Sequence, residues 1–257
     1  MKIVCWNVNS VGARLDRVSA FLKRSAPDVL MLQEIKCMEE KFPADVIRDL
    51  GYVHQAVFGQ KTYNGVAILS RHPLTNVVKG FGDGHEDPQS RFIKAEIGGL
   101  TLVDVYVPNG QERGSEKFAF KMKWLERLGA WLDSNIRKDQ KFLMAGDFNI
   151  APEERDVCDP AKYAELIHFT PEERAALAKV VEFGLIDSFR LHHPDAGLYS
   201  WWDYRELSFP KNKGLRIDLM YLTPALSHLC TATGIDRDER KGEKPSDHAP
   251  IWAELNL

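Results

Sequence analysis

The sequence predicts an α/β protein that folds as a single domain over residues 1–257. Short apolar runs alternate with stretches whose hydrophobic residues recur at helical spacing, and both kinds occur in each half of the chain. The sequence contains no internal repeat, low-complexity tract or linker that would divide the halves. A chain of 257 residues is long enough to bury a core without disulfides or metals as staples.

Each predicted strand is an apolar or alternating run that ends at polar residues or at glycine. In chain order these runs are 2–8, 29–32, 66–70, 92–97, 100–107, 142–145, 215–222 and 251–255. Asn64-Gly65 and Gly98-Gly99 are typical of hairpin turns. Helical spacing predicts helices at 15–22 and 118–132, and a third begins at Thr170, which forms a capping box with Glu173.

Composition points to a globular protein with no membrane span. Hydrophobic residues make up 44% and charged residues 28% of the chain, and no segment approaches the ~20 apolar residues that span a bilayer. The amino terminus enters a strand without a signal-peptide pattern, so we expect a cytoplasmic protein. Its four cysteines lie far apart, without zinc-ligand spacing, and are expected to be reduced. A net charge of −3 argues against binding nucleic acid by bulk electrostatics, but leaves a local basic face open.

Polar side chains recur where predicted strands end. Gly146-Asp147-Phe148-Asn149 is the clearest case, since side chains two apart on a strand share a face. The alternative for this tetrapeptide is an ordinary turn. Similar residues on or after other strands are Asn7, Glu34, Asp218, Asp247 and His248.

If these strand ends converge, their carboxylates repel one another unless a cation joins them. Oxygen ligands without thiolates favour Mg²⁺ or Mn²⁺. Amides and an Asp-His pair beside such a metal are the groups needed for metal-assisted attack of water on a phosphate ester. The alternative is a set of scattered surface acids.

Six blocks in this order resemble the signature of the exonuclease III family of apurinic/apyrimidinic endonucleases, within the endonuclease/exonuclease/phosphatase superfamily. The blocks are Trp6-Asn7-Val8-Asn9, Leu32-Gln33-Glu34, Val105 to Gly110, Gly146 to Asn149, Leu215 to Asp218 and Ser246-Asp247-His248. Trp201 to Arg205 adds a seventh, similar to bacterial exodeoxyribonuclease III. The resemblance implies a four-layered α/β sandwich, in which two mixed β-sheets pack face to face with helices on the outer faces.

The resemblance also implies a role for each site residue. Glu34 would be the principal ligand of Mg²⁺, for which Mn²⁺ could substitute, with Asn7 and Asp247 beside it. Asp147 would orient and deprotonate the attacking water. Asn149 and Tyr106 would donate to the phosphate oxygens, and Asp218 would hold His248 toward the same phosphate. Whether one metal or two act stays open.

A DNA substrate would need contacts beyond this pocket. Trp201 is expected to line the pocket that receives an extruded sugar, with core packing as the alternative. Basic side chains could form a rim that contacts the DNA backbone, although each could also be a solvated surface charge. These are Lys61, Arg91, Lys117, Lys121 and Arg205, together with Lys211, Lys213 and Arg216.

The predicted function is a Mg²⁺-dependent DNA repair nuclease that acts as a 3′-5′ exonuclease and 3′-phosphatase or phosphodiesterase. Its partner would be double-stranded DNA with damaged or recessed 3′ ends or abasic sites, and the expected state is a monomer. His168 is predicted to occupy the space of an internal abasic site and to disfavour incision there; the alternative is a surface histidine. The competing functions are a phosphatase for a small phosphoester such as a phosphoinositide, and an inactive DNA-binding module.

Overall fold

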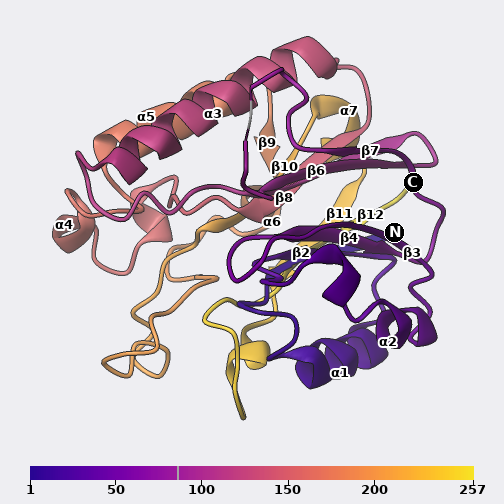
Figure 1. Cartoon of the computed structure of the whole chain (residues 1–257). Helices are drawn as coiled ribbons and strands as arrows, with labels where there is room; N and C mark the ends of the chain where they lie inside the picture. The colour runs from indigo at the N-terminus through magenta and orange to yellow at the C-terminus, as the bar shows by residue number, and fades with distance from the viewer. Residues whose placement is uncertain (86) are drawn as a thin grey trace.

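Two six-stranded sheets pack face to face in the computed structural model, which describes residues 1–85 and 87–257 (Figure 1). The first sheet has the order β11-β12-β1-β2-β4-β3, and only β1 and β2 run parallel. Its strands are β1 (Lys2–Asn7), β2 (Val29–Gln33), β3 (His54–Phe58), β4 (Val66–Ser70), β11 (Cys230–Ile235) and β12 (Ile251–Leu255).

The second sheet has the order β5-β6-β7-β8-β10-β9, with β7 and β8 as its parallel pair. Its strands are β5 (Thr75–Lys79), β6 (Phe92–Ile97), β7 (Leu100–Tyr106), β8 (Phe142–Asp147), β9 (Ile186–Asp187) and β10 (Asp218–Leu222). The turn at Gly98-Gly99 joins β6 to β7 as an antiparallel hairpin. Both sheets are mixed, as expected.

Helices cover the outer faces of the two sheets (Figure 1). The first sheet is covered by α1 (Leu15–Ser25) and α2 (Ala44–Asp49), and the second by α3 (Glu116–Asn135) and α5 (Pro171–Val181). The predicted capping box is present, because the Thr170 side chain accepts from the Glu173 N–H and Glu173 accepts from the Thr170 N–H. Shorter helices are α4 (Pro160–Tyr163), α6 (Ser188–His192), α7 (Pro224–Ser227) and the 3₁₀ turns Glu39–Lys41, Glu154–Asp156 and Arg237–Arg240. The predicted four-layered α/β sandwich is confirmed.

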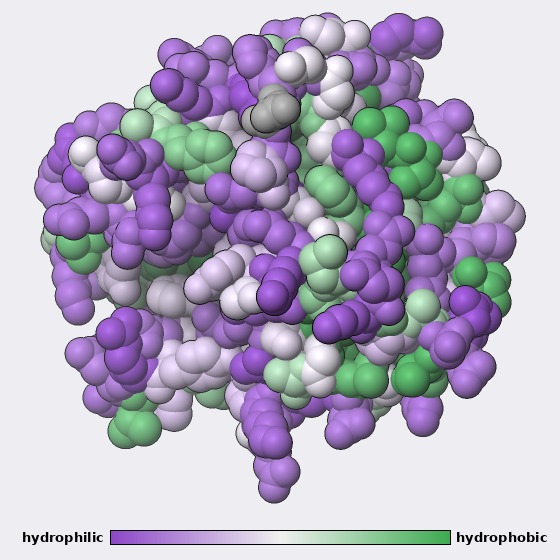
Figure 2. All heavy atoms as spheres, viewed as in Figure 1, coloured by the Kyte–Doolittle hydropathy of each residue, from purple (hydrophilic) through white to green (hydrophobic). Residues whose placement is uncertain are grey.

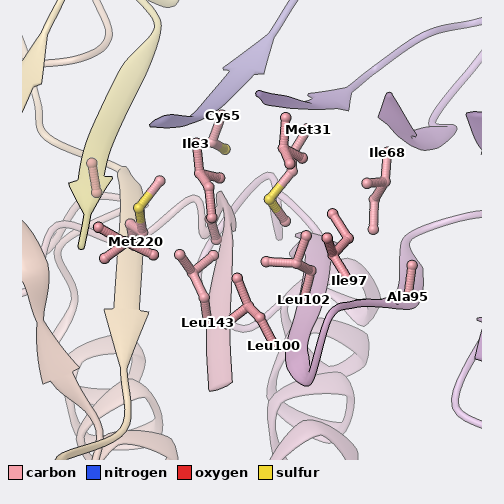
Figure 3. Packing of buried hydrophobic residues seen from close by; sticks show 14 of the residues in the cluster. Ile3, Cys5, Met31, Ile68, Ala95, Ile97, Leu100, Leu102, Leu143 and Met220 are labelled. Carbon is pink, nitrogen blue, oxygen red and sulfur yellow. The ribbon is translucent and has the colours of Figure 1, made fainter. Parts of the chain in front are cut away.

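The central core lies between the sheets and draws on both halves of the chain. Figure 3 shows Ile3 and Met31 of the first sheet pointing toward Leu102 and Leu143 of the second. Two further cores lie on the outer faces, one between each sheet and the helices that cover it. The face seen in Figure 2 is mostly hydrophilic, with hydrophobic side chains in small separate groups. Within the described residues, no helix is both long and apolar enough to cross a membrane.

Candidate active site

Strand ends from both sheets meet at one edge of the sandwich. In the first sheet Asn7 pairs with Gln33, which places Glu34 just beyond the end of β2. In the second, Asp147 lies between Tyr106 of β7 and Asp218 of β10. The Asn7 side-chain amide donates to Asp147 Oδ2 at 2.9 Å and to Glu34 Oε1 at 2.9 Å. This amide therefore joins the two sheets at the point where their carboxylates converge.

Glu34 and Asp147 have different electrostatic surroundings. Burial raises the pKa of Glu34, but Lys36, whose Nζ is 2.7 Å from Oε2, together with Asn7 and His248 outweighs burial and the pKa lies below its usual value. Burial raises the pKa of Asp147 to about 7, with Asp218 and Glu34 adding to the effect and His248 opposing it. Glu34 is thus held as an anion, whereas Asp147 can take up a proton near neutral pH.

His248 is held by the acid predicted to hold it. Its Nδ1 lies 2.9 and 3.1 Å from the two oxygens of Asp218, and its Nε2 lies 3.7 Å from Asp147 Oδ2. Burial alone would lower its pKa, but the carboxylates around it, Asp218 first, raise the pKa to about 10. The ring is therefore an imidazolium at neutral pH, and its Nε2–H can donate to an anion.

Asn149 forms a turn and also belongs to the site. β8 ends at Asp147, whose Oδ1 accepts from the Asn149 N–H at 2.8 Å, while Asn149 adopts a left-handed backbone with φ 52°. Its Nδ2 donates to the carbonyl of Val107 at 3.0 Å and lies 3.3 Å from Asp147 Oδ2. Its Oδ1 accepts from the Asn109 amide at 3.2 Å. The turn alternative is therefore confirmed, and this turn places the Asn149 amide beside Asp147.

Arg91 lies behind Tyr106. Its guanidinium stacks 4.5 Å from the centre of the Tyr106 ring, and its Nη1 donates to the Tyr106 carbonyl at 3.1 Å. Burial raises the pKa of the Tyr106 hydroxyl, and the Glu34 and Asp147 carboxylates raise it further. The hydroxyl therefore stays protonated and can donate a hydrogen bond.

Asp247, which precedes His248 in the chain, is bound by polar side chains and is not among the three residues whose ligand atoms gather within 4.8 Å. Its Oδ2 accepts from Trp201 Nε1 at 3.0 Å and its Oδ1 from Asn9 Nδ2 at 3.0 Å. Trp201 is positioned by backbone bridges to His248 and Leu215. The structure thus links Trp201 to the site through Asp247. Trp202, in contrast, is fully buried in the core.

His168 lies in the wall of a pocket next to Trp201. Only 8% of the residue is exposed, its ring centre is 5.9 Å from that of Trp201, and its Nδ1 is 2.8 Å from the Asn149 carbonyl oxygen. The alternative of a surface histidine is therefore wrong. The pocket has a volume of about 510 Å³ and is also lined by Tyr163, Arg113 and Arg205. Burial lowers the pKa of His168 to about 4, so the ring is neutral at physiological pH.

Five of the predicted rim residues are exposed: Lys61, Lys117, Arg205, Lys211 and Lys213. Arg91 and Lys117 line a second hollow of about 350 Å³ beside Asn109. Lys121 is a correction, because its side chain is fully buried and ion-paired with Glu173. Arg216 is a second correction, since it is buried and bound by Asp156 and Asp187. Neither side chain reaches the surface, so neither can contact a DNA backbone in this conformation.

Sequence reasoning missed three polar residues of the site. Lys36 pairs with Glu34, Asn9 binds Asp247, and Asn109 binds the Asn149 amide. Asn9 and Asn109 belong to the quoted blocks, so their sequence positions were a usable signal. Lys36 follows Glu34 by two residues, but nothing in the sequence distinguishes it from a solvated lysine.

The chemistry of this edge agrees with comparisons to known proteins. Residues 4–248 match the Endonuclease/Exonuclease/phosphatase family, and the chain belongs to that family.

Its relatives include nucleases from bacteria and archaea. Exodeoxyribonuclease III of Haemophilus influenzae is 40% identical over 267 positions, covering 99% of this chain and 100% of that protein. A structure of the 3′ phosphatase NExo from Neisseria bound to product DNA hairpin is 41% identical, with a TM-score of 0.96 and 100% coverage of both chains. An AP endonuclease from Archaeoglobus fulgidus is 36% identical, with a TM-score of 0.97 and the same coverage. The predicted resemblance to the exonuclease III family is confirmed, and the chain is a hydrolase.

The family is metal-dependent, and the residues present suit a metal. Ligand atoms of Glu34, Asp147 and His248 lie within 4.8 Å of one another. Two carboxylates facing each other fit a hard divalent cation, which would relieve their repulsion. His248 fits less well as a ligand because it is an imidazolium. Asn7 turns its amide nitrogen toward the carboxylates, while its oxygen accepts from the Asn9 N–H at 3.0 Å. The amide would have to rotate before Asn7 could be a ligand.

Proposed function

We propose that this chain is a Mg²⁺-dependent DNA repair nuclease that hydrolyses phosphodiesters and phosphomonoesters at 3′ ends. The observation that carries the proposal is the convergence of Glu34, Asp147 and an Asp218-held His248 at one sheet edge. Glu34 would provide an anionic metal ligand, Asp147 a base whose pKa is about 7, and the His248 imidazolium a hydrogen-bond donor.

Glu34 would be the principal ligand of the metal, with Asn7 and Asp247 beside it. When bound, Mg²⁺ would supply positive charge to a phosphate oxygen and lower the pKa of a bound water. Asp147 would orient the attacking water and accept its proton, and its raised pKa brings the carboxylate close to the working pH of a general base. The Asn7 and Asn149 contacts to Asp147 keep the carboxylate oriented.

Three donors would stabilise the charge that develops on the phosphate oxygens. His248 offers Nε2–H, fixed by the bond between its Nδ1 and Asp218. Tyr106 offers its hydroxyl, and Asn149 offers its amide once the phosphate displaces its present acceptors. Donors held in place before the reaction favour the transition state more than the ground state.

The surfaces around the site support duplex DNA as the substrate. Exposed Lys61, Lys117 and Arg205 would contact the backbone, and Arg91 lines the same hollow as Lys117. A small phosphoester would not need these cations, so the phosphatase alternative explains less of the surface. A binding module without chemistry would not need the Asp218–His248 pair. We also propose that the chain acts as a cytoplasmic monomer and forms one domain over residues 1–257.

Trimming of 3′ ends is favoured over incision at internal abasic sites because of His168. Its ring fills one wall of the Trp201 pocket, where an extruded sugar would have to enter. His168→Gly should therefore raise abasic incision relative to 3′ trimming. Unchanged relative rates would refute this selectivity role.

A gel assay with three duplexes tests the function. The duplexes carry one abasic site, a 3′ phosphate or a recessed 3′ end, each with Mg²⁺ and with EDTA. We expect Mg²⁺-dependent processing of the two 3′ substrates. Hydrolysis of an inositol phosphate without cleavage of any duplex would refute the nuclease assignment.

A further inference from the structure

A buried ion pair lies directly behind Asn149. Lys121 of α3 and Glu173 of α5 contact each other, and both side chains are 0% exposed. The Lys121 ammonium also donates to the carbonyl oxygens of Asn149 at 2.7 Å and Asn109 at 3.1 Å. All three of its N–H donors are therefore used, one on a carboxylate and two on the backbone of the site.

Glu173 also contacts the segment before α5, and so connects the Lys121 ammonium to that segment. Its Oε1 also accepts from the His168 N–H at 3.2 Å, and its Oε2 accepts from the N–H and hydroxyl of Thr170 at 3.0 and 2.9 Å. The His168 ring adds a second contact to the Asn149 carbonyl. One backbone carbonyl at the strand end is thus held from α3 and from the segment that precedes α5.

This carbonyl belongs to a residue in a costly conformation. Asn149 has φ 52°, a left-handed backbone that side-chain-bearing residues adopt only when their surroundings hold them there. Lys121 also fixes the backbone of Asn109, whose side chain binds the Asn149 amide at 3.2 Å. Two of the contacts that place Asn149 therefore involve Lys121: its own bond to the Asn149 carbonyl and, through the Asn109 backbone, the bond from the Asn109 side chain.

Stability alone is a weak reason for this ion pair. The desolvation of two fully buried charges largely offsets their attraction, and a well-packed apolar pair is often as stable. We propose that Lys121 and Glu173 are positioning residues that hold the Asn149 amide in place to bind the reacting phosphate. This inference rests on the proposed function, in which that amide binds phosphate.

Steady-state kinetics on a duplex with a 3′ phosphate, with Mg²⁺, test the inference. Lys121→Met leaves Glu173 with three other donors, so we expect a folded variant with kcat reduced about tenfold and a nearly unchanged KM. Lys123→Met is the matched control, because Lys123 is exposed on the same helix and should leave both constants unchanged. Wild-type kcat in Lys121→Met together with a lowered melting temperature would overturn the inference in favour of a purely structural role.

A double-mutant cycle with Asn149→Ala identifies the route of the effect. If Lys121 acts through Asn149, Lys121→Met should change kcat less than about twofold in the Asn149→Ala background. Equal reductions in both backgrounds would overturn the inference. Wild-type kcat in Asn149→Ala would instead refute the phosphate-binding role of the amide, so failure of the proposed function is distinguishable.

The double variant Lys121→Met/Glu173→Gln, which removes both charges, tests the same inference if the single change unfolds the chain. We expect this pair to fold, because no unpaired charge is left buried, and to show the same loss of kcat. A pair variant that is folded and fully active, or one that cannot fold at all, would overturn the inference by assigning the ion pair to stability.

Discussion

Gly146→Ala should damage stability and activity together, because Gly146 of β8 leaves no room for a side chain against the backbone of β7. Gly146 is paired with Val105, one residue before Tyr106 and Asp147 on their strands. A Cβ at position 146 would lie 1.9 Å from the Val105 carbonyl oxygen, whereas ordinary contact begins at 3.4 Å. The strands would therefore have to separate by about 1.5 Å, and backbone cannot rotate away as a flexible side chain can.

Overpacking of this kind costs typically 1–3 kcal/mol, and a clash with backbone places Gly146→Ala near 3 kcal/mol, roughly. For a chain of this size the melting temperature should fall by about 6–12 °C. Because both shifted strands end in site residues, a displacement on the order of 1 Å should also reduce kcat about 100-fold in the folded variant.

The assay combines urea denaturation with kinetics at a temperature where the variant is folded. Gly129→Ala is the matched control, since Gly129 is in α3 and an added Cβ meets nothing within 4 Å. That control should be stabilising by about 0.5–1 kcal/mol and fully active. Wild-type stability and rate for Gly146→Ala would refute the close-approach argument.

Three further outcomes are expected. Asp147→Asn should lower kcat about 1,000-fold yet retain DNA binding in a gel-shift assay, because it removes the proposed base and keeps the shape; retained cutting would exclude Asp147 as the base. EDTA should abolish cutting and added Mg²⁺ restore it, as the duplex assay would record; cleavage that persists in EDTA would contradict the metal requirement. Burial lowers the pKa of His168 from 6.5 to about 4, so the unfolded chain binds the extra proton between these values and the contribution of His168 to stability should rise with pH across that window. At 1.36 kcal/mol per pKa unit the gain is at most about 3 kcal/mol, and urea denaturation of His168→Asn should show a correspondingly smaller dependence on pH.

Local patterns predicted eight of the twelve strands that the structure describes and missed β3, β5, β9 and β11. The run 142–145 became β8, the glycine pair became the β6–β7 turn, and the capping box formed at Thr170 as expected. Prediction failed where the environment is set by another element. Lys121 has the same chemistry as exposed Lys117, one turn earlier on α3, and only the packing of α3 against α5 buries it beside Glu173.

The sequence by itself determined which residues end strands, because period-2 runs and glycine signals are local. Its ordered blocks also determined the family, which the comparisons confirmed. Only the tertiary structure decided how those ends meet. The Asn7 amide bridges two sheets. Asp218 lies 30 residues from His248 in the sequence, and its contact with the His248 ring keeps that ring protonated. Distances and pKa values depend on which strands become neighbours and how much water is excluded, and neither is encoded in any single stretch of the chain.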